Sequence, residues 1–114
     1  MPPCIFCSII EKKAPARFVY EDETAVAFYT INPVAPVHLL IVPRKYIASV
    51  NMVEPEDEAL LGHMFSVARQ LADEAGVAHS GYRLITNTGP DGGQSVYHIH
   101  LHLIGGKHLP FRFE

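Results

Sequence analysis

The chain has 114 residues, of which 48% are hydrophobic and 18% charged, and its net charge is −3. This length suits one domain with its own core, so we expect a single domain over residues 1–114. The charge balance lacks the concentrated basic face that a nucleic-acid backbone binder needs. No apolar run approaches the ~20 residues of a membrane span. We therefore expect neither nucleic acid nor membrane as a partner, while small anionic ligands stay open.

The N-terminal segment CIFCSIIEKK has apolar residues at helical spacing and predicts a short helix that ends before Pro15. MPPCIFCSIIEKK lacks the charged start and long apolar stretch of a secretory signal, so we expect a cytoplasmic protein. Cys4 and Cys7 form a CxxC pair. In such a compartment metal binding or redox chemistry is favoured over a structural disulfide. A pair of unligated thiols is the open alternative.

Three strands are predicted next. Residues 17–20 and 24–31 are rich in β-branched and aromatic residues, with a polar turn between them. The segment NPVAP then predicts a rigid loop, because its two prolines prevent regular pairing. VHLLIVP follows as a mostly apolar strand that contains one histidine, His38.

Residues 55–75 carry the pattern of a long helix. Pro55 suits the first turn, the acidic residues after it complement the helix dipole, and Gly76 is a natural stop. We expect His63 to face outward or to meet a partner. The apolar stripe at spacings of three and four should pack on a sheet; it consists of Leu60, Leu61, Met64, Phe65, Ala68, Leu71, Ala72 and Ala75.

The last third predicts two more strands. One spans 81–87, a turn-rich loop with three glycines follows, and GGQSVYHIHLHLIGG at 92–106 forms the other. Strands outnumber helices and the connection lengths suit antiparallel pairing, so the expected class is α+β.

Three histidines alternate with apolar residues in this last segment. In a strand His98, His100 and His102 would share one face, with Ile99, Leu101 and Leu103 directed into the core. The outer two would lie ~13 Å apart, too far to share one metal with bonds of ~2.0–2.1 Å. Imidazole also serves as a nucleophile or general base.

His38, on a separate strand, suits an extension of this cluster, and a satisfied core histidine is its alternative role. The preceding loop NTGPDGGQS offers small residues whose backbone N–H groups can converge on a phosphate. Asn87, Gln94 and Ser95 add polar side chains. The loop lacks the GK[ST] ending of a Walker A motif. Together the two features predict a phosphate site beside a nucleophile.

The segment HIHLHLI matches the signature of the histidine triad (HIT) proteins. CIFCSII, YEDETAVAFYTINPVAPVHLLIVPRKYI, EALLGHMF and GYRLITNTGPDGGQSVYHIHLHLIGG are similar, in order and spacing, to the Hint branch of that family. The resemblance implies a HIT-like fold, a five-stranded antiparallel sheet with one long and one short helix. It also implies a homodimer whose two sheets join and whose C-terminal tails help to shape the partner's active site.

The resemblance further implies a nucleotide hydrolase or transferase that cleaves purine nucleoside phosphoramidates of the AMP-amine type at the α-phosphorus. His100 would attack phosphorus and form a nucleotidyl-histidine intermediate, and His102 would hold phosphate oxygens. His38 and His98 would set orientation and tautomer. No metal cofactor is required for that mechanism. Ser95 would contact phosphate and leaving group, and the phosphate side would be lined by Asn87, Gly93 and Gln94.

By the same resemblance an apolar slot holds the purine, at positions that match Ile5, Phe6, Ile9, Phe28, Ile31 and Leu40. Two positions depart from the family pattern. An acidic residue that commonly binds the ribose hydroxyls is replaced by Thr30. Many bacterial relatives bind zinc through the CxxC pair and two histidines, and here Tyr46 replaces one of these, leaving Cys4, Cys7 and His98 as ligands of a structural zinc.

Two other functions compete with the phosphoramidase. One is a dinucleoside polyphosphate hydrolase, which the Hint-like context of the triad disfavours. The other is a non-catalytic nucleotide-binding or regulatory dimer. The complete triad, together with Ser95 and Asn87, argues against a loss of activity.

Overall fold

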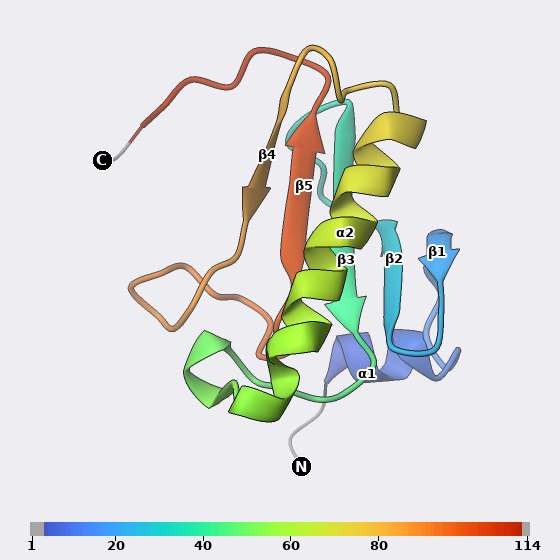
Figure 1. Cartoon of the computed structure of the whole chain (residues 1–114), viewed down its shortest axis with the longest axis vertical. Helices are drawn as coiled ribbons and strands as arrows, with labels where there is room; N and C mark the ends of the chain where they lie inside the picture. The colour runs from blue at the N-terminus through green and yellow to red at the C-terminus, as the bar shows by residue number, and fades with distance from the viewer. Residues whose placement is uncertain (1–3, 113–114) are drawn as a thin grey trace.

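A five-stranded antiparallel sheet forms the centre of the protein in the computed structural model, which describes residues 4–112 (Figure 1). The strands lie in the order β1-β2-β3-β5-β4. One long and one short helix accompany them, so the predicted α+β class is confirmed. The bounds are α1 Ile5–Ile10, β1 Phe18–Glu21, β2 Ala25–Tyr29, β3 Val37–Pro43, α2 Glu58–Glu74, β4 Tyr82–Ile85 and β5 Leu101–Gly105. Within residues 4–112, no helix has the length and apolar character that a membrane crossing requires.

Helix α2 covers one face of the sheet and runs across its middle strands (Figure 1). The predicted helix over 55–75 is confirmed, except that its first turn, Pro55–Asp57, is a 3₁₀ turn. A capping box between Glu54 and Asp57 starts it, and Lys45 Nζ lies 2.6 Å from Asp57 Oδ1. Gly76, with φ +77°, ends the helix in a conformation that favours glycine.

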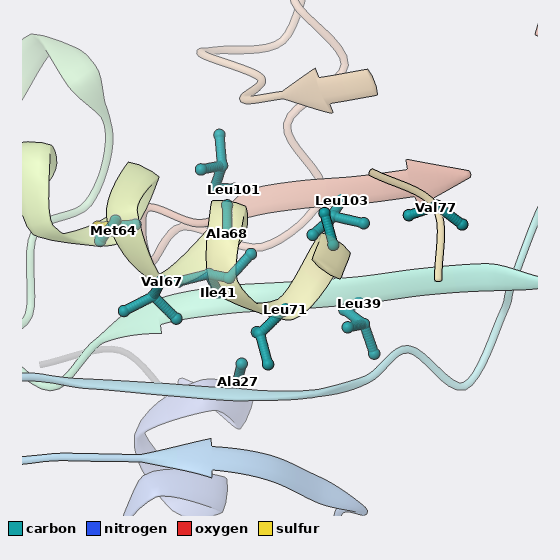
Figure 2. Close-up of a cluster of buried hydrophobic side chains, with 11 residues drawn as sticks. Ala27, Leu39, Ile41, Met64, Val67, Ala68, Leu71, Val77, Leu101 and Leu103 are labelled. Carbon is teal, nitrogen blue, oxygen red and sulfur yellow. The ribbon is translucent and has the colours of Figure 1, made fainter. Parts of the chain in front are cut away.

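The core between α2 and the sheet is aliphatic (Figure 2). Alternate residues of the strands face the helix, as the period of two along a strand requires. The buried cluster comprises Ala27, Leu39, Ile41, Met64, Val67, Ala68, Leu71, Ala72, Val77, Leu101 and Leu103. Most of the predicted stripe of α2 therefore packs on the sheet, but Phe65 of that stripe is 55% exposed and Ala75 is exposed as well.

Helix α1 packs against the intervening strand positions, on the other face. Phe6 and Ile9 of α1 are buried in a second cluster with Val26, Phe28, Leu40 and Val42. Leu40 of β3 pairs directly with His102 of β5, so this second face carries both the α1 cluster and a histidine of the triad. The two faces thus have different tasks: one holds the long helix and the other holds the site.

Two strands, β2 and β4, are shorter than predicted. β2 ends at Tyr29 rather than 31, and β4 covers Tyr82–Ile85 rather than 81–87. Among residues 4–112, β4 pairs with β5 alone, and this ladder ends at the pair Ile85 and His102. No other described strand continues the pairing of β4 beyond Ile85.

The last strand begins at Leu101, so the prediction of one strand through all three histidines is wrong for His98 and His100. If the ladder between β3 and β5 continued, it would reach Pro43, which has no N–H to donate. The Pro43 carbonyl instead accepts a hydrogen bond from the His98 ring at 2.8 Å. The backbone N–H of Ile99 instead donates to Ile47 O at 2.7 Å. At His98 and Ile99, hydrogen bonds to Pro43 and Ile47 thus take the place of backbone pairing between β3 and β5.

His63 does not point freely outward. Its Nε2 lies 2.6 Å from Asp22 Oδ2, to which Tyr20 Oη also donates. The other carboxylate oxygen of Asp22 accepts from the backbone N–H groups of Thr24 and Ala25. This histidine therefore attaches α2 to the turn between β1 and β2.

Candidate active site

His100 lies just before β5 and is 5% exposed. Its Nδ1 is 2.8 Å from the backbone oxygen of His98. A carbonyl oxygen only accepts, so Nδ1 carries the hydrogen and Nε2 of the neutral ring keeps its lone pair. Burial lowers the pKa of His100, which favours this neutral form. The side chain therefore has the tautomer that a nucleophilic imidazole needs.

His102 is the histidine of the triad that lies within β5, and its tautomer is set from β3. Val34 N–H donates to His38 Nδ1 at 3.2 Å, so the hydrogen of neutral His38 is on Nε2. That Nε2 donates to His102 Nδ1 at 2.9 Å. The hydrogen of His102 is consequently on Nε2, where it can donate to a ligand.

The pKa of His102 is lowered to about 4 by burial, and by the neighbouring charges of His100 and His38 when these are protonated. Burial also lowers the pKa of His38. The rings of His100 and His102 lie 4.9 Å apart between centroids. Near neutral pH the pair thus offers one lone pair and one N–H donor from two uncharged rings.

His98 has a different environment. It is fully buried, and its Nε2 donates to Pro43 O at 2.8 Å, which leaves Nδ1 without a hydrogen. Nδ1 lies 3.4 Å from Cys4 Sγ and 3.5 Å from Cys7 Sγ. Its ring does not line the pocket beside the other two histidines. The three imidazoles therefore do not form one row toward a ligand, as a straight strand would have made them.

The two thiols and His98 Nδ1 form a candidate metal centre, because their ligand atoms all lie within 4.8 Å of one another. Two sulfurs and an imidazole nitrogen are donors that zinc prefers. Burial, together with the hydrogen bond between the Cys7 thiol and Cys4, raises the pKa of Cys7 to about 11, so without a cation this thiol stays protonated. Tyr46 packs edge-on against the His98 ring, with centroids 5.4 Å apart. The residues present fit a zinc ion with three protein ligands.

A pocket of about 580 Å³ opens beside His100 and His102. Its wall on one side is α1, where Phe6 lies edge-on to Phe28 and to the His100 ring, with centroids 5.6 and 5.0 Å away. Its lining includes most of the predicted nucleotide-binding residues, namely Ile5, Phe6, Ile9, Phe28, Thr30, Ile31, Leu40, Ser95, His100 and His102. The lining thus combines many apolar side chains with two imidazoles and with the hydroxyls of Ser95 and Thr30.

Three predicted phosphate-side residues lie outside this lining and shape the loop instead. Buried Gln94 donates to Ala48 O and Val96 O and accepts from Gly89 N–H. Asn87 Nδ2 donates to Gly92 O at 2.8 Å.

Glycine is required at two places in the same loop. A side chain at Gly92 would collide with the Thr88 carbonyl, and Gly93 has φ +78°. These residues hold the loop so that Ser95 reaches the pocket.

Sequence reasoning missed the backbone groups that orient the histidines: the carbonyls of Pro43 and His98 and the N–H of Val34. No residue pattern identifies such groups, since every residue has them. It also missed several residues of the pocket rim, which are Ala14, Pro15, Ala16, Arg17, Tyr29, Asn32 and Val96. Their nearness in sequence to α1, Thr30 and Ser95 was the available signal.

Comparison with known proteins agrees with this geometry. The HIT domain family model matches residues 11–109. The chain is 50% identical over 105 residues to the purine nucleoside phosphoramidase of Escherichia coli strain K12, an alignment that covers 92% of this chain and 88% of that protein.

Solved structures are also similar. A HIT family hydrolase from Legionella pneumophila Philadelphia 1 has a TM-score of 0.94 and 46% identity, with 96% of this chain and 97% of that chain covered. A Zn-bound histidine triad family protein from Mycobacterium smegmatis has a TM-score of 0.80 and 32% identity, with coverage of 97% and 82%. The chain therefore belongs to the histidine triad family, and the HIT domain accounts for both its sheet and its paired imidazoles.

Proposed function

We propose that the protein hydrolyses purine nucleoside phosphoramidates at the α-phosphorus through a covalent nucleotidyl-His100 intermediate. The observation that carries this is the hydrogen bond from His100 Nδ1 to the His98 carbonyl, which leaves Nε2 free at the pocket. The 50% identity to a purine nucleoside phosphoramidase supports the same activity.

The reaction runs in two displacements. His100 Nε2 attacks phosphorus, the P–N bond to the amine breaks, and the amine leaves with its electron pair and takes up a proton from solvent. Water then attacks the same phosphorus and releases a proton to solvent, the bond between phosphorus and Nε2 breaks, and the nucleoside monophosphate leaves. Covalent catalysis of this kind divides one difficult step into two easier ones.

The neighbouring groups have distinct roles in this scheme. His102 Nε2–H donates to a phosphate oxygen, and His38 keeps that hydrogen in place. Ser95, which lines the same pocket as the two imidazoles, contacts the phosphate and the leaving group. The purine lies against the apolar side chains of the lining around Phe28.

We also propose that two copies associate, in line with the resemblance to the Hint branch. β4 is an edge strand of the described sheet, and apolar Val50 and Phe65 are 44% and 55% exposed on the α2 side. Both line a small apolar hollow of about 100 Å³. Sedimentation of the protein and of Phe65→Glu tests this, and a monomeric wild-type protein would contradict it.

The metal centre and the compartment complete the proposal. Zinc is proposed to occupy Cys4, Cys7 and His98 in a structural role, with no part in either displacement. We propose a cytoplasmic location, and the two cysteines support it, because they form no disulfide and the cytoplasm keeps thiols reduced. One domain is proposed to span the chain, of which residues 1–3 and 113–114 lie outside the described part.

A fluorogenic AMP-amine substrate tests the activity. His100→Ala should lose activity by about 10³-fold or more, because no other group forms the covalent bond. His79→Ala is the matched control, since His79 is exposed and lies outside the pocket lining. A nucleotide adduct on His100, trapped by rapid denaturation at alkaline pH, where the P–N bond of a nucleotidyl-imidazole survives, and located by mass spectrometry, should appear with the wild-type protein. Equal turnover by wild type and His100→Ala would contradict the proposal, and faster cleavage of diadenosine polyphosphates would change the substrate class.

A further inference from the structure

The pocket beside the two imidazoles contains no acidic side chain among its described lining residues. Its polar side chains are Arg17, Tyr29, Thr30, Asn32 and Ser95, besides the two histidines. A vicinal diol of ribose is commonly read by a carboxylate, which accepts from a hydroxyl of the sugar. This pocket therefore lacks the chemical group that most often separates ribose from deoxyribose.

The sugar of a bound nucleotide has a defined place in this pocket. Its phosphate has to reach His100 Nε2, and its base has to lie among the apolar side chains around Phe28, so the sugar lies between these ends. Thr30 follows Phe28 by two positions and faces the same side of the sheet. Its N–H donates to the backbone oxygen of His38, whose ring supports His102. Thr30 thus lies between Phe28 and the histidine pair formed by His38 and His102.

The Thr30 hydroxyl has a local partner. Its Oγ1 accepts from the backbone N–H of Asn32 at 3.2 Å, the bond of a short polar turn. One hydroxyl that already accepts one bond cannot receive two O–H groups of a diol as a carboxylate does. Thr30 can exchange one ordinary hydrogen bond with the sugar, and such a neutral bond has a small net effect.

From this lining we propose that the site discriminates little between ribose and 2′-deoxyribose, so that purine 2′-deoxynucleoside phosphoramidates are substrates alongside the ribonucleoside compounds. The proposal rests on the proposed function and adds the sugar class of its substrates. Recognition then depends on the base and the phosphate.

The test compares kcat/KM for AMP-amine and dAMP-amine with the same fluorogenic leaving group. The wild-type protein should give values within about threefold of each other, since one neutral hydrogen bond is at stake. Thr30→Asp should shift the ratio toward the ribonucleotide by about tenfold or more, because hydrogen bonds to a charged acceptor are stronger. Thr30→Asn and Thr30→Ser are matched variants without a charge, and both should keep the wild-type ratio. A wild-type preference for ribose of tenfold or more would overturn the proposal.

A binding measurement separates this proposal from the proposed function. Calorimetric titration of the wild-type protein with AMP and with dAMP requires no turnover, and the two dissociation constants should agree within about threefold. Tighter binding of AMP by tenfold or more would overturn the sugar proposal even in an active enzyme. If neither phosphoramidate is cleaved, the proposed function fails, while the ratio of the two dissociation constants still decides the sugar preference.

Discussion

The Nδ1 atom of His100 donates to the backbone oxygen of His98 at 2.8 Å, and the His98 ring is itself held between Pro43 O and the two thiols. The nucleophile is therefore oriented by the backbone carbonyl of His98, and the buried ring of the same residue holds that carbonyl in position. His98 thus belongs to the candidate metal centre through its ring and contacts the candidate nucleophile, His100, through its backbone oxygen.

Replacement of His98 by alanine should consequently impair catalysis more than binding. The carbonyl stays, but it loses the ring that holds it, so kcat should fall by about 10- to 100-fold while KM changes little. Steady-state kinetics measures both, and circular dichroism with thermal melting checks that the protein is folded. A KM that rises with kcat unchanged would show that His98 acts on substrate binding instead.

His38 should act through the proton of His102. His38→Phe removes the N–H that His102 Nδ1 accepts, so the hydrogen of His102 is no longer confined to Nε2, and kcat/KM should fall by about tenfold or more. His38→Gln keeps an N–H donor and should retain more activity than the phenylalanine variant. Equal losses in the two variants, both folded by their melting curves, would contradict a role in setting the tautomer.

Acidification should lower the free energy of unfolding over the pH range between the pKa values of His102 in the unfolded and the folded chain. The pKa of folded His102 is about 4, lowered chiefly by burial, against 6.5 for the unfolded side chain. The unfolded chain thus binds the extra proton between these values. The contribution of His102 to stability is therefore complete above pH 6.5 and falls as the pH drops toward 4. Urea unfolding at pH 7.5, 6 and 5 measures this for wild type and His102→Asn. The asparagine variant should lose less stability over the same range, and parallel losses would show that other groups dominate.

Much of this architecture follows from local patterns. The stripe of α2 and the alternation of the strands predicted the α+β fold, because burial of one face is a property of neighbouring residues. The division of labour among the histidines did not follow. It depends on contacts across 55 residues between His98 and Pro43 and 64 residues between His38 and His102. Such partners are determined by the folded chain. The folded chain also determines that the ladder between β3 and β5 stops before His100, so that His98 and His100 lie outside β5.

The spacing of the triad predicted that the three histidines lie close together, but it did not predict the direction in which each side chain points. An unbroken strand would have turned all three imidazoles to one ligand. In the folded chain Pro43 O accepts from His98 instead of continuing a backbone ladder, and this single exchange sends His98 to the thiols. His100 and His102 remain at the pocket.

Tyr46 should decide how firmly a metal is held. The Tyr46 ring contacts His98, and the resemblance to zinc-binding relatives places a histidine at position 46. Among the described residues a zinc ion would therefore find three protein ligands, with a fourth position open to water. Tyr46→His should therefore bind zinc at least about tenfold more tightly than wild type, and Cys4→Ser should bind it more weakly. Competition with a chromophoric chelator gives the affinities, and the cobalt-substituted proteins report coordination by their visible absorption.

Thermal melting gives a readout independent of catalysis. Chelator should lower the melting temperature of zinc-loaded wild-type protein and of Tyr46→His, but should leave Cys4→Ser nearly unchanged, because metal bound only to the folded state stabilises it. Tyr46→Phe is the matched control, since it keeps the ring against His98 and should behave like wild type. A phenylalanine variant that loses zinc would show instead that the Tyr46 hydroxyl is a ligand, and the site would then have four protein donors.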